Sequence, residues 1–360
     1  MPRTEKHFRW GIFGTGAIST KFVSGLATAK AAKPVFVASR SLTKAQKFAT
    51  AMGITRAIEG YDKAAATEDV DAVYIATPPA LHAEHALICI QRGIPVLVEK
   101  PFTSTAGEAQ QIISAARGKS VFAMEALWTR FLPAAQALRE KIINHAIGEV
   151  RIITGNFGIS QTPADENAMF NPKLGGGALA HLGVYPLSLA QWLFGTPKLV
   201  QAMGTISSTG VDEDVAFQLR YDKGVIASFS VSMRSWAADL LQISGTEGML
   251  SLRGSIVRPY GLDISHEMPR PQEVTNFGWR ATMRQNAWVH MLAQRFGRSS
   301  RANMQRHDYY YAGNGYHYQA DEVRACISRG AAESTVMPLN DSLAVATTID
   351  TIRNMIRREA

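Results

Sequence analysis

The sequence predicts a two-domain α/β protein, with a parallel sheet in the N-terminal domain and a large, mainly antiparallel open sheet in a C-terminal α+β domain. At 360 residues the chain is longer than a single hydrophobic core usually serves. Its first part alternates strand-like and helix-like segments, which is typical of a parallel sheet. Alternating strand-like segments joined by turn signals follow, and they favour antiparallel pairing. We place the boundary near Glu125, at the end of the strand-like segment SVFAME, which gives domains 1–124 and 125–360.

The N-terminal domain begins with a strand, turn, helix and strand unit. The strand-like segment FRWGIF precedes a glycine-rich turn, and PVFVAS follows the next helical pattern. Gly14 permits a tight turn, and Gly16 leaves room for a pyrophosphate at the positive end of the helix that begins near Ala17 and Ile18. A glycine-rich turn alone is weak evidence, but its flanking strands favour a dinucleotide-binding Rossmann domain.

The residues after the second strand indicate which dinucleotide is bound. NAD-specific sites usually place a carboxylate here, to hold the ribose 2′-hydroxyl. This chain has Ser39, Arg40 and Ser41 instead, followed by Lys44. Because an arginine and hydroxyls suit a 2′-phosphate, the sequence predicts NADP rather than NAD. The alternative is that Arg40 simply lies on a surface loop.

Polar residues also follow the next two predicted strands. Ligands bind at the carboxyl ends of parallel strands, so the residues that come directly after these strands are candidates for contact with the cofactor. A lysine between a buried strand and a proline is aimed at this edge of the sheet. The candidates are Thr77, Pro78, Pro79 and His82 after one strand, and Glu99 and Lys100 at the end of the other. For His82 the alternative is that it only caps a helix.

Composition excludes several other classes of protein. The net charge of +8 is spread along the chain without a nucleic-acid-binding motif, so we expect no nucleic-acid partner. No segment is apolar for long enough to span a membrane, and the N-terminus does not resemble a signal peptide, so we expect a cytoplasmic protein. Cys89 and Cys326 lie far apart in helix-like contexts, which predicts packing roles and no metal site.

Several motifs together resemble the glucose-fructose oxidoreductase, inositol dehydrogenase and MocA (Gfo/Idh/MocA) family. They are GIFGTGAIS, ATPPALHAEHA, Glu99-Lys100-Pro101, and a glycine triplet followed by Gly183 and Tyr185. The segments 124–133, 170–187 and 315–343 look most like the branch that contains dimeric dihydrodiol dehydrogenase and NADP-dependent D-xylose dehydrogenase. The resemblance implies a Rossmann domain, an open-sheet domain, and hydride exchange between NADP and a sugar-like or cyclic-diol substrate.

The resemblance also implies two catalytic residues, and we add a third that departs from the family pattern. Tyr185 matches the acid/base position of the family, and Lys100 would orient and polarise the reacting oxygen and lower the pKa of Tyr185. His181 lies four residues before Tyr185, so a helix would place both on one face. It stands where the branch usually has an aspartate, which leaves substrate identity open. We expect His181 to contact substrate, with a structural role as the alternative.

Two further residues and one segment bear on the site. The resemblance places Trp128 near substrate and Arg130 near cofactor, and for Trp128 the alternative is a core position. Residues 277–313 form a segment that looks longer than in the branch, and part of it has helical spacing. We expect that helix to pack on its own domain; a lid or a partner surface is the alternative.

The sequence therefore predicts an NADP-dependent oxidoreductase acting on a small polyhydroxylated or cyclic-diol substrate. The broad open sheet, together with the resemblance, predicts a homodimer formed through that sheet. Two alternatives share the fold: a non-catalytic NADP-binding sensor, and a redox-neutral glycosidase that uses NAD(P).

Overall fold

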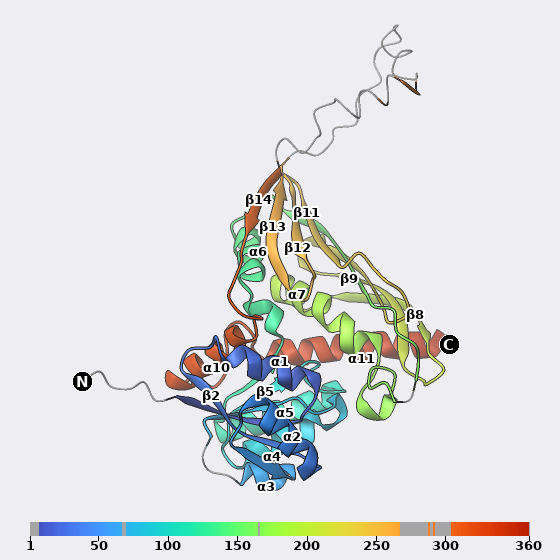
Figure 1. The fold of residues 1–360 in the computed structure, drawn as a ribbon. Helices are drawn as coiled ribbons and strands as arrows, with labels where there is room; N and C mark the ends of the chain where they lie inside the picture. Colours follow the sequence, from blue (N-terminus) through green and yellow to red (C-terminus); the bar gives the residue numbers. More distant parts are fainter. Residues whose placement is uncertain are drawn as a thin grey trace, which may run out of the picture.

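A computed structural model describes residues 7–66, 70–164, 166–266, 287–288, 291 and 304–359. Within these residues the chain forms two sheets with helices around them, and the N-terminal sheet lies at the bottom of Figure 1. The helix expected within residues 277–313 falls largely outside the described residues, so it stays a prediction.

The N-terminal sheet has six parallel strands in the described residues, in the order β3-β2-β1-β4-β5-β6. This is the order of the Rossmann fold, and the strand order reverses between β1 and β4, which is where dinucleotides bind in this fold. The fold-class prediction is confirmed. Its strands are β1 Phe8–Phe13, β2 Ala32–Ser39, β3 Arg56–Glu59, β4 Ala72–Ile75, β5 Val96–Glu99 and β6 Ala123–Ala126. The predicted boundary after residue 124 falls inside β6, and the domain division stays a prediction.

Helices cover both faces of this sheet, and its central strands are apolar enough to be buried between them. The residues of β4 and β5 are completely buried, as expected for central parallel strands. Thr105 and Glu108 form a capping box that fixes where α5 begins. The helices are α1 Ala17–Leu26, α2 Leu42–Met52, α3 Tyr61–Ala65, α4 His82–Gln91 and α5 Ala106–Lys119.

The second sheet has eight strands in the described residues, in the order β14-β13-β12-β11-β7-β10-β9-β8. Its pairs are antiparallel except β7 with β10, which are parallel neighbours. The expectation of a mainly antiparallel sheet is confirmed, whereas the parallel pair of β7 and β10 is not predicted by the sequence. The strands are β7 Val150–Gly158, β8 Leu199–Ile206, β9 Asp212–Arg220, β10 Ile226–Ser232, β11 Leu240–Gly245, β12 Met249–Gly254, β13 Pro259–Ser265 and β14 Met304–Asp308.

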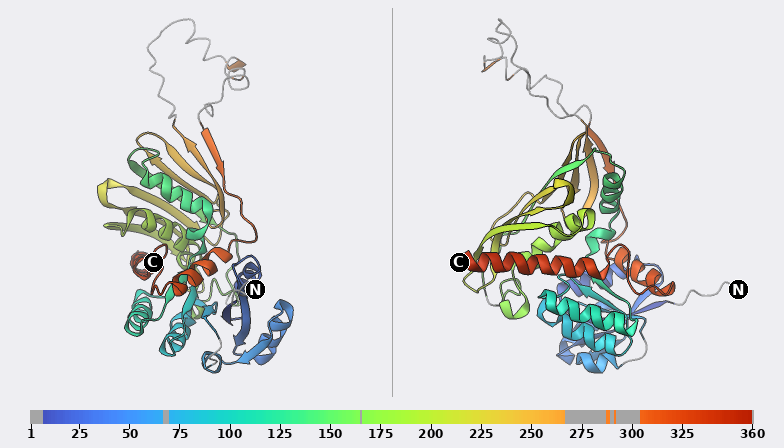
Figure 2. Two further views of the ribbon diagram at one scale, coloured as in Figure 1. Left: turned by 90° about the vertical axis from the view of Figure 1, so that its left-hand side faces the viewer. Right: turned by 180° about the vertical axis from the view of Figure 1, so that it is seen from behind.

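Helices of the second domain join the two sheets. Figure 2 shows α11 running between the N-terminal domain and the eight-stranded sheet, and Asp350 on this helix accepts a hydrogen bond from the Ala106 amide of α5. No helix in the described part of the chain is long and apolar enough to cross a membrane. The remaining helices are α6 Pro133–Ile143, α7 Val184–Phe194, α10 His317–Ser328 and α11 Leu339–Glu359.

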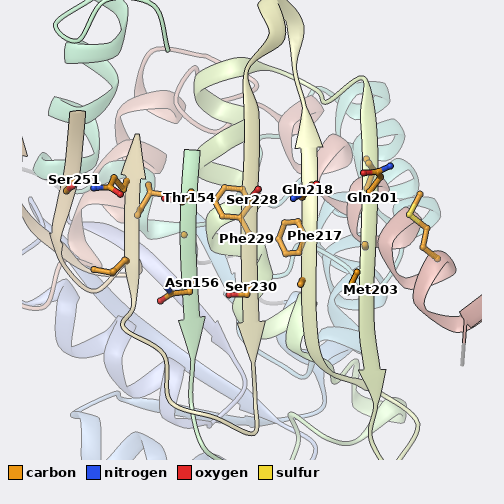
Figure 3. Close-up of a pocket in the computed structure, with 18 residues that line it drawn as sticks. Thr154, Asn156, Gln201, Met203, Phe217, Gln218, Ser228, Phe229, Ser230 and Ser251 are labelled. Carbon is orange, nitrogen blue, oxygen red and sulfur yellow. The ribbon is translucent and has the colours of Figure 1, made fainter. Parts of the chain in front are cut away.

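The two faces of the eight-stranded sheet differ in burial. Along β9 and β10, alternate residues such as Phe217 and Phe229 are buried. On the other face, a hollow of about 720 Å³ lies over neighbouring strands, and its lining includes polar side chains such as Gln201, Gln218 and Ser228 together with apolar ones such as Val200, Met203 and Leu240 (Figure 3). Exposed apolar side chains, including Ile152, Ile226 and Leu240, are scattered over the strands of this sheet. This face is therefore open in the single chain.

Candidate active site

The glycine-rich turn joins β1 to α1 as the sequence predicts. Gly14 has a φ of 104°, and a Cβ there would lie 2.6 Å from the Ala76 carbonyl oxygen of the neighbouring strand end. A Cβ on Gly16 would meet nothing within 4 Å. Helix α1 begins at Ala17 with no side-chain cap and no acidic residue in its first turn. Its first amides, those of Ala17 and Ile18 included, are thus available to an anion, and the turn fits a pyrophosphate.

The end of β2 carries the residues expected near a 2′-phosphate. Ser39 is buried, and its hydroxyl accepts a hydrogen bond from the Ser41 amide at 3.3 Å. The Ser41 hydroxyl caps α2 by accepting from the Lys44 amide. Arg40 and Lys44 are exposed. Two hydroxyls and two cations therefore lie at one strand end, a composition that fits a phosphate group.

The sequence does not predict one residue at this edge. Glu59 ends β3 and is the register partner of Ser39 in β2. Its Oε1 accepts a hydrogen bond from the Leu42 amide, at the start of α2, at 3.4 Å. No motif indicates this placement, because the carboxylate comes from a short strand some twenty residues further along the chain.

The segment after β4 is held by two histidines. The Thr77 hydroxyl contacts Nδ1 of His85 at 2.9 Å. His82 is buried, with Nε2 at 2.8 Å from the Thr77 carbonyl oxygen and Nδ1 at 2.9 Å from the Pro101 carbonyl oxygen. Pro78 is half-buried and Pro79 begins a short 3-10 helix. Both ring nitrogens of His82 lie within hydrogen-bonding distance of backbone carbonyl oxygens, which braces the two strand ends, and its cofactor contact stays a prediction.

The end of β5 places Glu99 and Lys100 side by side in different surroundings. The buried Glu99 carboxylate accepts hydrogen bonds from the Tyr74 hydroxyl at 2.5 Å and from the Lys100 amide at 3.1 Å. Burial raises the pKa of Glu99 to about 7, against the effects of Tyr74 and Lys100, which lower it. The Glu99 carboxylate therefore bonds to groups inside the protein, and these bonds hold the strand end that carries Lys100.

Tyr185 and His181 come from a helix that begins with a π-helical turn, Leu179–Gly183. The sequence predicts ordinary helical spacing here, and Pro186, which lacks an N–H donor, is one reason for the departure. Asp212 anchors this turn by accepting a hydrogen bond from the Leu179 amide at 2.7 Å. The sequence does not predict this contact, because Asp212 lies at the start of β9, far along the chain from Leu179.

Lys100, His181 and Tyr185 meet between the two domains. The Lys100 Nζ lies 5.2 Å from the centre of the Tyr185 ring and donates a hydrogen bond to the His181 carbonyl oxygen at 3.2 Å. The imidazole Nε2 of His181 is buried and has no hydrogen-bond partner among the described residues. The structure therefore brings the three predicted catalytic residues together.

Burial controls the protonation of these three residues. It lowers the pKa of His181 to about 3, and the charges of Lys100 and Arg353 act in the same direction. It also lowers the pKa of Lys100, which Glu99 partly restores. Burial raises the pKa of Tyr185, and the charge on Glu99 adds to this effect. The expected lowering of the Tyr185 pKa is therefore wrong for the protein without bound molecules.

Trp128 and Arg130 lie on the same 3-10 turn but have different roles. The Trp128 ring stacks on Tyr316 at 4.5 Å between centroids, and its indole N–H is buried without a hydrogen-bond partner among the described residues. Arg130 is fully buried, and its guanidinium donates to Ser188, to the Val336 carbonyl oxygen and to Asp341. Each guanidinium nitrogen has a protein partner, which gives Arg130 a structural role, and its cofactor contact stays a prediction.

A Rossmann domain with a lysine and a tyrosine meeting beside the strand ends defines a nucleotide-dependent oxidoreductase. The oxidoreductase family model with a NAD-binding Rossmann fold, GFO/IDH/MocA, matches residues 8–127, and the model of its C-terminal domain matches residues 135–251. The chain belongs to the GFO/IDH/MocA family, and it is a dehydrogenase or reductase.

Curated relatives cover nearly the whole chain. The trans-1,2-dihydrobenzene-1,2-diol dehydrogenase of Mus musculus is 32% identical over 97% of this chain and 96% of its own length. The enzyme of the same name from Bos taurus is 31% identical over 97% of this chain and 96% of its own length.

Solved structures share the fold at lower identity. An aldose-aldose oxidoreductase from Caulobacter crescentus, complexed with glycerol, superposes with a TM-score of 0.80 at 20% identity, covering 99% of each chain. A 3-ketoreductase from Actinomadura kijaniata, in complex with NADP and TDP-benzene, gives a TM-score of 0.79 at 21% identity over 98% of each chain. A levoglucosan dehydrogenase in complex with NADH and levoglucosan gives 0.80 at 19% identity, over 99% of this chain and 98% of its own.

Proposed function

We propose that the protein is an NADP-dependent oxidoreductase that transfers a hydride between nicotinamide and a hydroxyl-bearing carbon of a small polyhydroxylated or cyclic-diol substrate. The observation that carries this proposal is the 5.2 Å separation between the Lys100 Nζ and the Tyr185 ring centre. Oxidation of an alcohol carbon needs a group that removes the hydroxyl proton, and reduction of a carbonyl needs one that supplies it. The phenol of Tyr185 is suited to this transfer.

Lys100 and Tyr185 have different roles at the reacting oxygen. The ammonium of Lys100 donates a hydrogen bond to that oxygen and stabilises negative charge on it. Burial raises the pKa of Tyr185, so its hydroxyl is protonated and can donate a proton when a carbonyl is reduced. In the direction of oxidation, the positive charge of Lys100 must offset the cost of forming a buried phenolate. The nicotinamide, when bound, supplies the redox chemistry.

The cofactor would lie along the carboxyl ends of the six parallel strands. The turn at Gly14 and Gly16 and the start of α1 fit its pyrophosphate, and Ser39, Arg40 and Lys44 fit a 2′-phosphate. Thr77, Pro78 and Pro79 would border it further along the same edge. Structural relatives bind NADP in one case and NADH in another, so the preference for NADP is part of the proposal.

Trp128, His181 and Tyr185 would contact substrate. The indole of Trp128, stacked on Tyr316, offers an apolar surface suited to a sugar ring or an aromatic diol. The neutral imidazole of His181 offers a hydrogen-bonding nitrogen that is not engaged within the described residues. The names of the curated relatives, which are dehydrogenases of a cyclic diol, support this substrate class.

Assembly and location form part of the proposal. The open face of the eight-stranded sheet, with Ile152, Ile226 and Leu240 about half exposed, supports a homodimer formed through this sheet. Cys89 and Cys326 are buried and unpaired, which agrees with a cytoplasmic protein.

The test is to follow absorbance of reduced nicotinamide with purified protein, NADP or NAD, and a panel of aldoses, inositols, anhydro-sugars and cyclic diols. Turnover that produces or consumes reduced NADP would support the proposal. Tight binding of NADP without any turnover across the panel would contradict it, and would favour a sensor or a redox-neutral enzyme.

A further inference from the structure

A carboxylate lies at the end of β3, directly beside the strand end expected to hold the cofactor ribose. Glu59 pairs with Ser39 in the β2–β3 ladder, and the Gly60 amide donates to the Ser39 carbonyl oxygen at 2.9 Å. These contacts fix the two strand ends side by side. The Glu59 side chain then reaches the Leu42 amide, so it occupies the first turn of α2.

The amide that Glu59 occupies is one that a 2′-phosphate would be expected to use. Leu42 is the first residue of α2, and its N–H has no partner within the helix. Ser41, which precedes it, and Arg40 are the residues already expected to face a 2′-phosphate. A carboxylate and a phosphate therefore have overlapping positions at one helix end.

Arg40 and Glu59 lie at the same edge of the sheet but are not joined by an ion pair among the described residues. The positive charge of Arg40 instead acts on the ionisation of Tyr61 and His85. Tyr61 and His85 lie 4.1 Å apart between ring centroids. The cation and the carboxylate at this edge therefore remain two separate charges, each with its own neighbours.

Building on the proposed function, we propose that Glu59 sets cofactor selectivity by competing with the 2′-phosphate of NADP and by accepting the 2′-hydroxyl of NAD. A phosphate brought to this strand end must displace the Glu59 carboxylate from the Leu42 amide and meets its negative charge. A ribose hydroxyl donates a hydrogen bond to the same carboxylate at no such cost. The preference for NADP that Arg40 provides is therefore reduced, and the protein binds both cofactors.

The test compares dissociation constants for NADP and NAD, measured by calorimetry on the full chain, in the wild type and in Glu59→Gln. The glutamine oxygen can still accept from the Leu42 amide, so the fold should persist. We expect the ratio of the NAD to the NADP dissociation constant to rise about tenfold, because one negative charge near the phosphate is lost at a solvated site. Glu140→Gln, which makes the same charge change on the exposed surface of α6, should leave the ratio unchanged.

The outcomes separate this inference from the function on which it rests. An unchanged ratio in Glu59→Gln, with wild-type binding of NADP intact, would overturn the role of Glu59 and leave the oxidoreductase proposal standing. Binding of neither cofactor by the wild type would overturn both. A shift toward NAD in Glu59→Gln would also overturn the inference, because it would mean that the carboxylate assists the phosphate.

Discussion

The Nζ atom of Lys100 lies 5.2 Å from the centre of the Tyr185 ring, so one cation and one phenol from different domains face the same space. The proposed chemistry needs both groups. Lys100→Met and Tyr185→Phe should each lower kcat by at least about a thousandfold, because each removes a group that acts on the reacting oxygen. Steady-state turnover, with NADP binding measured separately, would check this.

Cofactor binding is the control for these two variants. Neither side chain is expected to hold the pyrophosphate or the 2′-phosphate, so NADP should bind both variants within about tenfold of the wild-type affinity. Full activity in either variant would contradict the assigned mechanism.

His181 should act as a neutral group. Because its pKa is lowered to about 3, the imidazole is already neutral at about pH 5 and does not titrate as the pH rises to about 9. His181→Gln should therefore raise the substrate KM while leaving the shape of the kcat–pH profile unchanged. Kinetics across that range would check both. If the substitution removed an ionisation near neutral pH from the profile, the assignment of a neutral His181 would be wrong.

His82 should support the site without contacting the reacting atoms. His82→Phe leaves the buried carbonyl groups of Thr77 and Pro101 without their imidazole partner, which should lower the free energy of unfolding by about 2–4 kcal/mol. It should also lower kcat, since Pro101 follows Lys100. Denaturant unfolding and turnover measure the two effects.

Thr77→Val is the matched control for His82. It removes only the hydroxyl that contacts His85 and keeps the carbonyl that His82 engages. A loss of stability in Thr77→Val as large as that in His82→Phe would argue against the brace.

The Rossmann half of the fold could be predicted because its signals are local. The turn at Gly14 and Gly16, and the apolar runs of β4 and β5, each reflect a constraint on neighbouring residues. Strand β3, only Arg56–Glu59, has partly exposed and charged residues and gives no such signal. For the same reason, the sequence does not predict that Glu59 lies beside Ser39. The sequence lacks an acid after β2, yet the fold supplies one from the adjacent strand.

The candidate site could be predicted in its residues but not in its electrostatics. A match to family motifs finds Lys100 and Tyr185, whereas the pKa of Tyr185 depends on burial and on Glu99, neither of which can be seen in the spacing of residues. Arg130 shows the converse: its partners Ser188 and Asp341 lie far along the chain, so its structural role could not be anticipated.

Glu99 should make stability depend on pH. Burial raises its folded-state pKa from 4.5 to about 7, so its contribution is fully present below about pH 4.5 and is lost as pH rises through 7. The corresponding loss is about 3 kcal/mol. His85, with a pKa lowered to about 4, acts in the opposite direction, because its contribution is lost as pH falls.

A comparison with Glu99→Gln isolates the contribution of Glu99. Denaturant unfolding of both proteins between about pH 5 and 8 should show the variant gaining stability relative to the wild type as pH rises. A constant difference between the two proteins across this range would show that Glu99 does not titrate as its burial requires.

The open face of the eight-stranded sheet should hold the proposed dimer together. Ile226 is 45% exposed on β10, and Leu240 is 50% exposed on β11, which β7 separates from β10 in the sheet. A charge placed among such side chains would be buried without a partner in a dimer, so Ile226→Asp should convert the dimer to monomer at micromolar concentration. Light scattering would measure the mass. Ile143→Asp introduces the same kind of charge at the end of α6, where Ile143 is 57% exposed, and should leave the dimer intact. A wild-type monomer, or an Ile226→Asp dimer of unchanged affinity, would show that this face does not form the interface.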